Sequence, residues 1–291
     1  MTLQAALDAM VADVDAHQLL LNDPIRFAHR YTAPADQEIA AFLASGLAYG
    51  RVSLFSPVIA ALLARADAMG GPAAWVSGFD PDRELPVLEP LYYRWNRGAD
   101  HVALLDGLRI LLAEHGSLGA LVALRPGETH VGPALSRMVG AIRAAVVGSE
   151  AGPRAWSEAS RGLRYLLPDP ADGSTAKRMA MFARWMVRSD GVDLGLWPHV
   201  PSHALVMPVD THVHRIALLV GLTRRKTADW RTSVELTEAL KRFDPVDPVR
   251  YDFALAHLGI SEGCNGRLQP EVCPRCPLQR HCVVGSVRDL P

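Results

Sequence analysis

The sequence predicts an all-α protein. Apolar residues recur with helical spacing along most of the chain, no β-hairpin signal stands out, and Pro and Gly fall mostly between the periodic segments. In chain order, the expected helices cover residues 3–20, 36–49, 57–69, 101–115, 133–147, 155–167, 174–188, 211–221, 231–242 and 248–259. Asp36, Ser56 with Pro57, and Asp210 with Thr211 are plausible starts for three of them, because these residue types favour the first positions of helices.

The composition is that of an ordinary globular protein, with 49% hydrophobic and 21% charged residues in a chain of 291. This length suits one large domain or two modest ones. No uninterrupted apolar run reaches the roughly 18 residues that a membrane span needs. The first residues carry acids where a signal peptide carries bases, so we expect a cytoplasmic protein without a membrane partner.

Basic residues are distributed unevenly in number and in kind. Residues 1–160 have a net charge of −5 and residues 161–291 one of +4, so phosphate contacts are expected in the second part. A solvated surface explains +4 over that length equally well. Of the 30 basic residues only Lys177, Lys226 and Lys241 are lysines. A lysine retained in an arginine-rich chain is a candidate for work that arginine cannot do, above all as a nucleophile.

All four cysteines lie within the last 28 residues, at Cys264, Cys273, Cys276 and Cys282, with the spacing C-x8-C-x2-C-x5-C. Two thiolates separated by two residues can reach one metal centre from a tight turn, and the outer two can complete a four-ligand cage. Disulfides are not expected in a cytoplasmic protein. The residues alone leave a structural zinc ion and a [4Fe–4S] cluster open.

This loop resembles that of endonuclease III and its relatives, which use C-x6-C-x2-C-x5-C. The last two intervals match, and the first is two residues longer here. The resemblance implies a [4Fe–4S] cluster bound by the four cysteines, with zinc as the alternative. The cluster would brace a basic loop near the DNA backbone, since Arg267, Arg275 and Arg280 interleave with the ligands.

A second motif, P-V-D-T-H-V-H-R at residues 208–215, resembles the aspartate-bearing segment of the helix-hairpin-helix DNA glycosylases. In that superfamily the pattern V-D-T-H-hydrophobic-x-R places a catalytic aspartate at a helix start. The resemblance therefore implies that Asp210 is catalytic. An N-cap role is the alternative, and both roles are compatible.

The superfamily also requires a hairpin between two helices. Residues 161–188 read as a helix, a turn P-D-P-A-D-G ending in Gly173, and a second helix starting at Ser174. Gly173 permits the turn, and the exposed amides of Ser174, Thr175 and Ala176 would hold a DNA phosphate. The resemblance then makes Lys177 the nucleophile, although the usual L-P-G-x-G hairpin is only partly present.

Lys226 is the competing lysine, because G-L-T-R-R-K-T-A at residues 221–228 resembles a hairpin ending. In the superfamily the hairpin lysine precedes the aspartate, whereas Lys226 follows Asp210. We therefore interpret Lys226 as a basic surface or phosphate-contacting residue.

Lys177 and Asp210 are 33 residues apart, a wider separation than in endonuclease III-like enzymes. The inserted segment, residues 189–208, makes the separation similar to that of the archaeal 8-oxoguanine glycosylases. Trp185 and Trp197, in or beside it, are candidates to stack on an extruded base, although tryptophans of helical proteins mostly pack in the core.

Residues 36–63 resemble the first helices of the superfamily and the turn that fills the gap left by an extruded base. Tyr49, Gly50, Arg51 and Ser53 are candidates for that turn, with Arg51 as a DNA contact. An ordinary helix–turn–helix of the core is the alternative.

Together these observations predict two helical subdomains of the helix-hairpin-helix glycosylase type with a C-terminal [4Fe–4S] loop. Residues 36–190 would form the barrel with the hairpin. Residues 191–291 would carry the aspartate and the cluster, and residues 1–35 would pack on them.

The expected function is a nucleoid-associated, monomeric glycosylase and AP lyase. It would remove a damaged base, with 8-oxoguanine the best guess, from double-stranded DNA through a Lys177 Schiff base. The alternatives are a monofunctional glycosylase for another base and a non-catalytic DNA-binding module with a structural metal.

Overall fold

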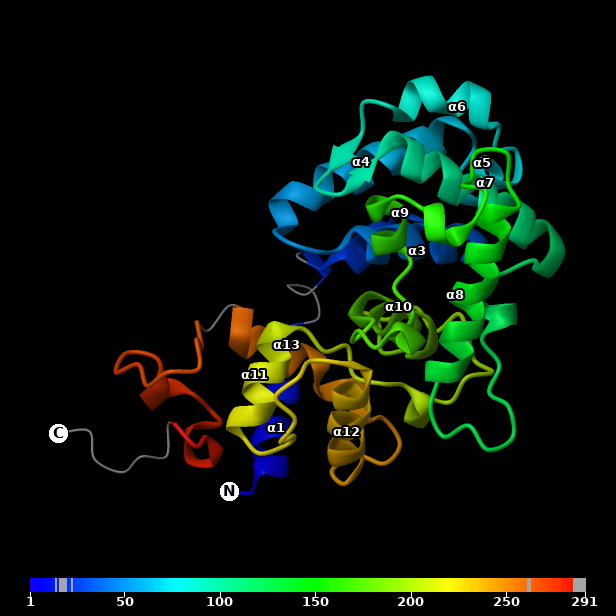
Figure 1. Ribbon diagram of the computed structural model, residues 1–291. Coiled ribbons are helices and arrows are strands. Elements are labelled where there is room, and N and C mark those ends of the chain that lie inside the picture. The colour runs from blue at the N-terminus through cyan, green and yellow to red at the C-terminus, as the bar shows by residue number, and fades with distance from the viewer. Residues whose placement is uncertain (14, 16–19, 22, 261–262, 285–291) are drawn as a thin grey trace.

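The computed structural model describes residues 1–13, 15, 20–21, 23–260 and 263–284, and these are mostly helical, which confirms the all-α expectation (Figure 1). The α-helices are α1 (Leu3–Ala12), α3 (Pro34–Leu47), α4 (Val52–Ala68), α5 (Pro72–Ser77), α6 (Pro81–Leu88), α7 (Gly98–His115), α8 (Gly132–Val147), α9 (Arg161–Leu166), α10 (Lys177–Val187), α11 (Thr211–Leu219), α12 (Trp230–Lys241) and α13 (Asp252–Ile260). The strands are β1 (Tyr92–Tyr93) and β2 (Asn96–Arg97). Short 3-10 turns link several of these elements. Among the described residues, no helix is long and apolar enough to cross a membrane.

Five α-helices begin after a side-chain cap, at Thr2, Asp80, Ser160, Asp210 and Asp229. Asp210 caps α11 as expected, since its Oδ1 accepts hydrogen bonds of 2.9 Å from the amides of His212 and Val213. Two expected starts are wrong. Helix α4 begins at Val52 and contains Pro57, and Asp36 lies inside the first turn of α3, where it binds the Ala73 amide at 2.8 Å. The helix expected at 3–20 ends at Ala12, and residues 14 and 16–19 lie outside the described part.

Two helices, one interrupted helix and a hairpin differ from the sequence-based expectation. Helices α5 and α6 were not foreseen, although Asp80 followed by Pro81 is a capped helix start. The helix expected at 155–167 is interrupted: a 3-10 turn covers Trp156–Glu158, and α9 begins after Ser160, whose Oγ accepts the Leu163 amide at 2.8 Å. Strands β1 and β2 form an antiparallel hairpin that pairs Tyr92 with Arg97 and Tyr93 with Asn96.

The helices pack in two groups. Helix α3 packs on α4, α5 and α10, while α7 packs on α5, α6, α8 and α9. Helix α13 packs on α11 and α1, and the 3-10 turn Pro248–Tyr251 contacts α1 and α12. Figure 1 shows α1, α11, α12 and α13 gathered beside the cysteine-bearing end, with α3 to α9 on the other side. The subdomain limits at residues 35 and 190 stay a prediction.

The inserted segment, residues 189–208, packs into the molecule rather than looping out. Its backbone follows α10, because the amides of Leu194 and Trp197 donate to the carbonyls of Trp185 and Met186 at 2.7 Å. The Trp197 indole N–H donates to Glu38 of α3 at 2.7 Å. Trp185 and Trp197 are therefore fully buried core residues, and the idea that either stacks on an extruded base is wrong.

Candidate active site

A turn between α9 and α10 occupies the place of the expected hairpin. Gly173 is exposed with a left-handed backbone, φ +80°, as the prediction requires. The second helix, however, begins at Lys177 rather than at Ser174. The reason is local: the Ser174 hydroxyl accepts the Ala176 amide at 3.1 Å, which uses one of the three amides expected to bind phosphate. The amides of Ser174 and Thr175 form no hydrogen bond within the described part of the chain.

Ala176, directly before the candidate nucleophile, is strained. Its backbone is left-handed, with φ +41° and ψ 35°, and its side chain is buried. A residue with a Cβ pays on the order of 1–3 kcal/mol for such a conformation, and residues of this kind cluster at functional sites. Ala176 is the residue directly before α10, so its backbone conformation sets where Lys177, the first residue of the helix, lies.

Lys177 lies on the same face of α10 as Met181 and Arg184. The three are spaced i, i+4 and i+7, and the Lys177 Nζ contacts the Met181 sulfur at 3.4 Å. Arg184 is buried and donates one hydrogen bond to Asp252, the first residue of α13, and another to Asp193 at 3.2 Å. This face of α10 therefore points from the Lys177 amine toward the start of α13.

The buried carboxyl of Asp252 is influenced by the charges of both predicted catalytic residues. Burial raises the pKa of the Asp252 carboxyl, Arg184 and then Lys177 lower it, and Asp210 raises it again. Lys177 and Asp210 are thus the two predicted catalytic residues whose charges influence this carboxyl. Helix α13, which begins at Asp252, packs on α11, which begins after Asp210. The charges of Lys177 and Asp210, 33 positions apart in sequence, thus influence the same carboxyl of Asp252.

The Asp210 carboxylate keeps one oxygen available. Both cap hydrogen bonds end on Oδ1. Oδ2 accepts no hydrogen bond in the ranges that the structure describes. One oxygen therefore anchors the side chain while the other can face a reacting atom or proton.

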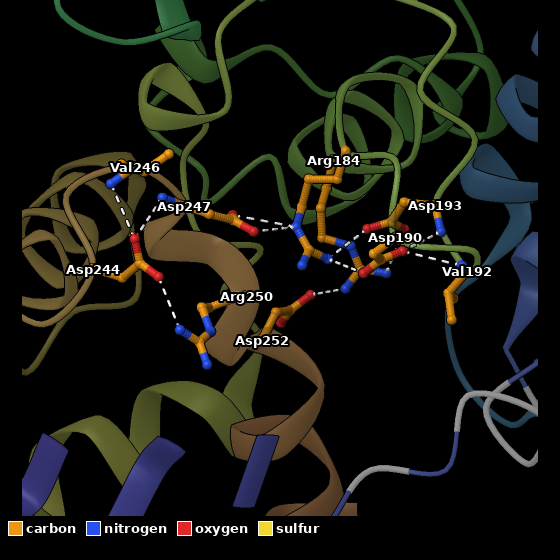
Figure 2. A network of polar contacts seen from close by, with 10 residues as sticks. Arg184, Asp190, Val192, Asp193, Asp244, Val246, Asp247, Arg250 and Asp252 are labelled. Atoms are coloured by element: carbon orange, nitrogen blue, oxygen red, sulfur yellow. Dashed lines mark hydrogen bonds and ion pairs between the residues drawn. The ribbon is translucent and has the colours of Figure 1, made fainter. Parts of the chain in front are cut away.

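An ion network includes Asp252 and the buried Arg184 and Asp193 (Figure 2). Besides the contacts of Arg184, Arg188 binds Asp193 at 2.7 Å and Asp190 and Asp247 at 2.9 Å. Burial raises the pKa of Asp193 to about 6, while Arg184 and Arg188 act in the opposite direction. The network ties α10 to both the inserted segment and the chain leading into α13.

The four cysteines come together. Cys264, Cys273, Cys276 and Cys282 all line one cavity of about 50 Å³, with Leu219 of α11 and Leu258 of α13 among its other walls. Burial raises the pKa of the Cys276 thiol, and the other three thiols raise it further, as expected for neighbouring sulfurs. Over the described ranges, no three His, Cys, Asp or Glu side chains are grouped as ligands of a metal ion.

Arg215 fastens the cysteine loop to the helix that Asp210 caps. Its Nη2 donates to the Cys264 carbonyl at 2.6 Å and contacts the His212 Nδ1 at 3.1 Å. Gly266, with φ +83°, lies so close that an added Cβ would stand 2.7 Å from the Arg215 Cδ. Arg215 is the arginine of the V-D-T-H-V-H-R motif, to which the sequence analysis gave no role. Residues of this motif thus form the helix start that Asp210 caps and also contact the cysteine loop through Arg215.

The remaining candidates fall into exposed and packed positions. Arg51 and Ser53 are exposed at the start of α4, whereas Tyr49 is half-buried and donates its hydroxyl to Asn96 at 2.5 Å. Gly50 has φ +81°. Lys226 is exposed in the loop between α11 and α12, as its surface interpretation requires.

The model of one protein family, described as "Protein of unknown function (DUF2400)", matches residues 23–261. No curated protein and no solved structure matches the chain.

Proposed function

Since the chain belongs to the DUF2400 family, whose description names no activity, we propose a function from its own residues: it is a DNA glycosylase with AP-lyase activity. The observation that carries this proposal is that the charges of Lys177 and Asp210 both influence the buried Asp252 carboxyl, at the start of a helix that packs on α11. A bifunctional glycosylase needs an amine and a carboxylate at one site, and Asp210 keeps one carboxylate oxygen without a cap hydrogen bond. The resemblance of residues 208–215 to the superfamily's aspartate motif points the same way.

The reaction assigns one role to each side chain. The target nucleotide is extruded from the duplex. The neutral Lys177 amine attacks C1′ as the C1′–N bond breaks, and the base leaves with the bonding electrons and takes up a proton. Asp210 stabilises the positive charge that develops on the sugar. Loss of the amine protons and opening of the sugar ring give a Schiff base, from which β-elimination breaks the 3′ phosphate bond. Asp252, held by Arg184, keeps the local charge balanced.

The proposed substrate is an oxidised purine, with 8-oxoguanine as the first choice. The 33-residue separation of Lys177 and Asp210 supports this choice through its similarity to the archaeal 8-oxoguanine glycosylases. Base release should be measured on duplexes that each carry one lesion: 8-oxoguanine, uracil, thymine glycol or an abasic site. Absence of release and of strand cleavage on every duplex would contradict the proposal.

Replacing Asp210 by Asn should lower base release by about 100-fold or more, because the charge is lost while the cap remains. Asp229→Asn is the matched control, since Asp229 caps α12 in the same way through the Thr232 amide at 2.9 Å. The control should retain wild-type release. Equal activity of the two variants would remove Asp210 from the mechanism.

The cysteine loop is proposed to hold a [4Fe–4S] cluster bound by Cys264, Cys273, Cys276 and Cys282. A cavity shared by all four cysteines supports a centre of several atoms. Four thiolates on one zinc ion would instead close to about 2.3 Å from that ion. The cluster would brace the loop that Arg215 fastens to α11.

Purified protein should accordingly contain iron and sulfide, with broad absorbance near ~400 nm. Cys276→Ala should lose the iron and this absorbance. If the purified protein contains one zinc ion per chain and no iron, the cluster proposal is wrong and the structural zinc site takes its place. This conclusion does not depend on the enzymatic activity.

A further inference from the structure

An exposed surface outside the proposed active site has an unusual composition. Residues 49–51, 92–97 and 161–165 contain five arginines and five aromatic residues, and no Asp or Glu. These three segments are the turn before α4, the β1–β2 hairpin and helix α9. They are called the arginine–aromatic surface below.

The three segments are locked together. The Tyr49 ring centroid lies 4.8 Å from that of Tyr93 and 4.7 Å from that of Tyr165. Asn96 donates to the Gly162 carbonyl at 2.8 Å. Beneath them, the buried Arg178 of α10 lies 4.5 Å from the Tyr165 centroid and donates to the Tyr165 carbonyl. The surface is therefore preorganised.

Large aromatic rings on this surface remain exposed. The exposed fraction is 54% for Tyr92, 43% for Trp95 and 39% for Tyr165, and all five arginines are exposed. The Arg161 guanidinium lies 3.4 Å from the Trp95 ring centroid, and that of Arg97 lies 4.0 Å from the Tyr92 centroid. The Tyr92 and Trp95 rings therefore each lie against a positively charged guanidinium group. Exposed apolar groups of this size commonly mark binding sites.

The hairpin turn presents two of these residues under strain. Arg94 and Trp95 form a two-residue loop, and Arg94 has φ +51° where glycine is usual. The opposing turn is equally constrained, because a Cβ on Gly50 would stand 2.7 Å from the Tyr93 hydroxyl. Strain of this kind persists where it places side chains for function.

We propose that the arginine–aromatic surface binds an unpaired DNA strand, with bases stacking on Trp95 and Tyr92 and phosphates paired with the arginines. Alternating stacking platforms and positive charges are how proteins bind single strands, because a base in a duplex has no free ring face. The inference rests on the proposed function for its choice of DNA. It adds a set of residues, other than Lys177 and Asp210, that holds unpaired nucleotides.

The test is binding of the full-length protein to a fluorescently labelled oligothymidylate, measured by anisotropy. Trp95→Ala should weaken binding by about tenfold or more. Trp95→Phe should retain binding but lose most of the quenching of tryptophan fluorescence, since Trp95 is the most exposed of the six tryptophans. Val246→Ala, at an exposed residue of the loop before α13, is the control and should bind normally.

The charges are tested by salt dependence. Arg97→Ala and Arg161→Ala should each lower the magnitude of the slope of log K against log salt by about 0.7, the contribution of one phosphate contact to a single strand. Arg242→Ala, at an exposed position outside the surface, should leave the slope unchanged. A single-stranded RNA serves as competitor and should bind more weakly, whereas the binding of intact duplex should not depend on Trp95.

Unchanged oligothymidylate binding by Trp95→Ala would overturn the inference, as would stronger binding of the RNA or an equal loss of duplex binding in Trp95→Ala. These outcomes are separate from failure of the proposed function. If no lesion is processed but binding still depends on Trp95, the surface stands and the glycosylase proposal fails. If lesions are processed and Trp95→Ala binds normally, the reverse holds.

Discussion

Replacing Lys177 by Gln is expected to abolish the covalent enzyme–DNA adduct that borohydride traps on an 8-oxoguanine duplex. The glutamine amide is not a nucleophile, so neither the Schiff base nor β-elimination can occur. Strand cleavage should fall on the order of 10³-fold or more, as is usual when a nucleophile is removed. Lys177 is half-buried at the start of α10 and its amine contacts only Met181 among the described residues, so the fold should tolerate the change.

Lys226→Gln is the matched control for this experiment. Lys226 is exposed in the loop between α11 and α12 and should leave the adduct unchanged. An adduct that persists in Lys177→Gln and disappears in Lys226→Gln would exchange the roles of the two lysines. Base release by the wild-type protein without any adduct would make it monofunctional, with Asp210 activating water.

Arg184→Met is expected to destabilise the protein by about 3–5 kcal/mol, because it leaves buried carboxylates without their cation. Arg184 is almost fully buried and contacts both Asp193 and Asp252. Chemical denaturation of the purified variant measures the change. Arg30→Met is the control, since the Arg30–Asp67 pair is exposed and contributes about 1 kcal/mol or less.

A second substitution separates lost pairing from lost volume. Adding Asp252→Asn to Arg184→Met should recover part of the stability, because one unpaired buried charge is removed. No recovery together with a small loss in Arg184→Met would mean that the network does not hold α10 to α13.

The parts of the site that sequence predicted are those set by local rules. Asp210 before Thr-His-Val is a cap in any context, and it caps α11. The cysteine spacing requires only a short loop to bring the thiols near one another. The choice of Lys177 rests on its position after Gly173 and stays a prediction. The helix start was misplaced, because the hydrogen bond from the Ala176 amide to the Ser174 hydroxyl is a local alternative to helix.

The parts that sequence missed depend on contacts between distant segments. Nothing in Y-Y-R-W-N-R indicates a turn, because the turn uses an arginine with positive φ. Arg184 and Asp252 were overlooked, although each is an isolated charge in an apolar run, M-F-A-R-W-M-V and Y-D-F-A-L. Two such charges of opposite sign are the signal of a buried pair, but their partnership is set by the tertiary fold.

The ion network of Arg184 and Arg188 also affects how the protein unfolds. The two arginines lie at α10, and their partners lie in residues 190–193 and 247–252. Separating these segments leaves buried charges without a partner. Partial opening is then costly relative to complete opening, which is the condition for cooperative melting. The helix that carries Lys177 and the helix that begins at Asp252 should lose their structure together, in one transition.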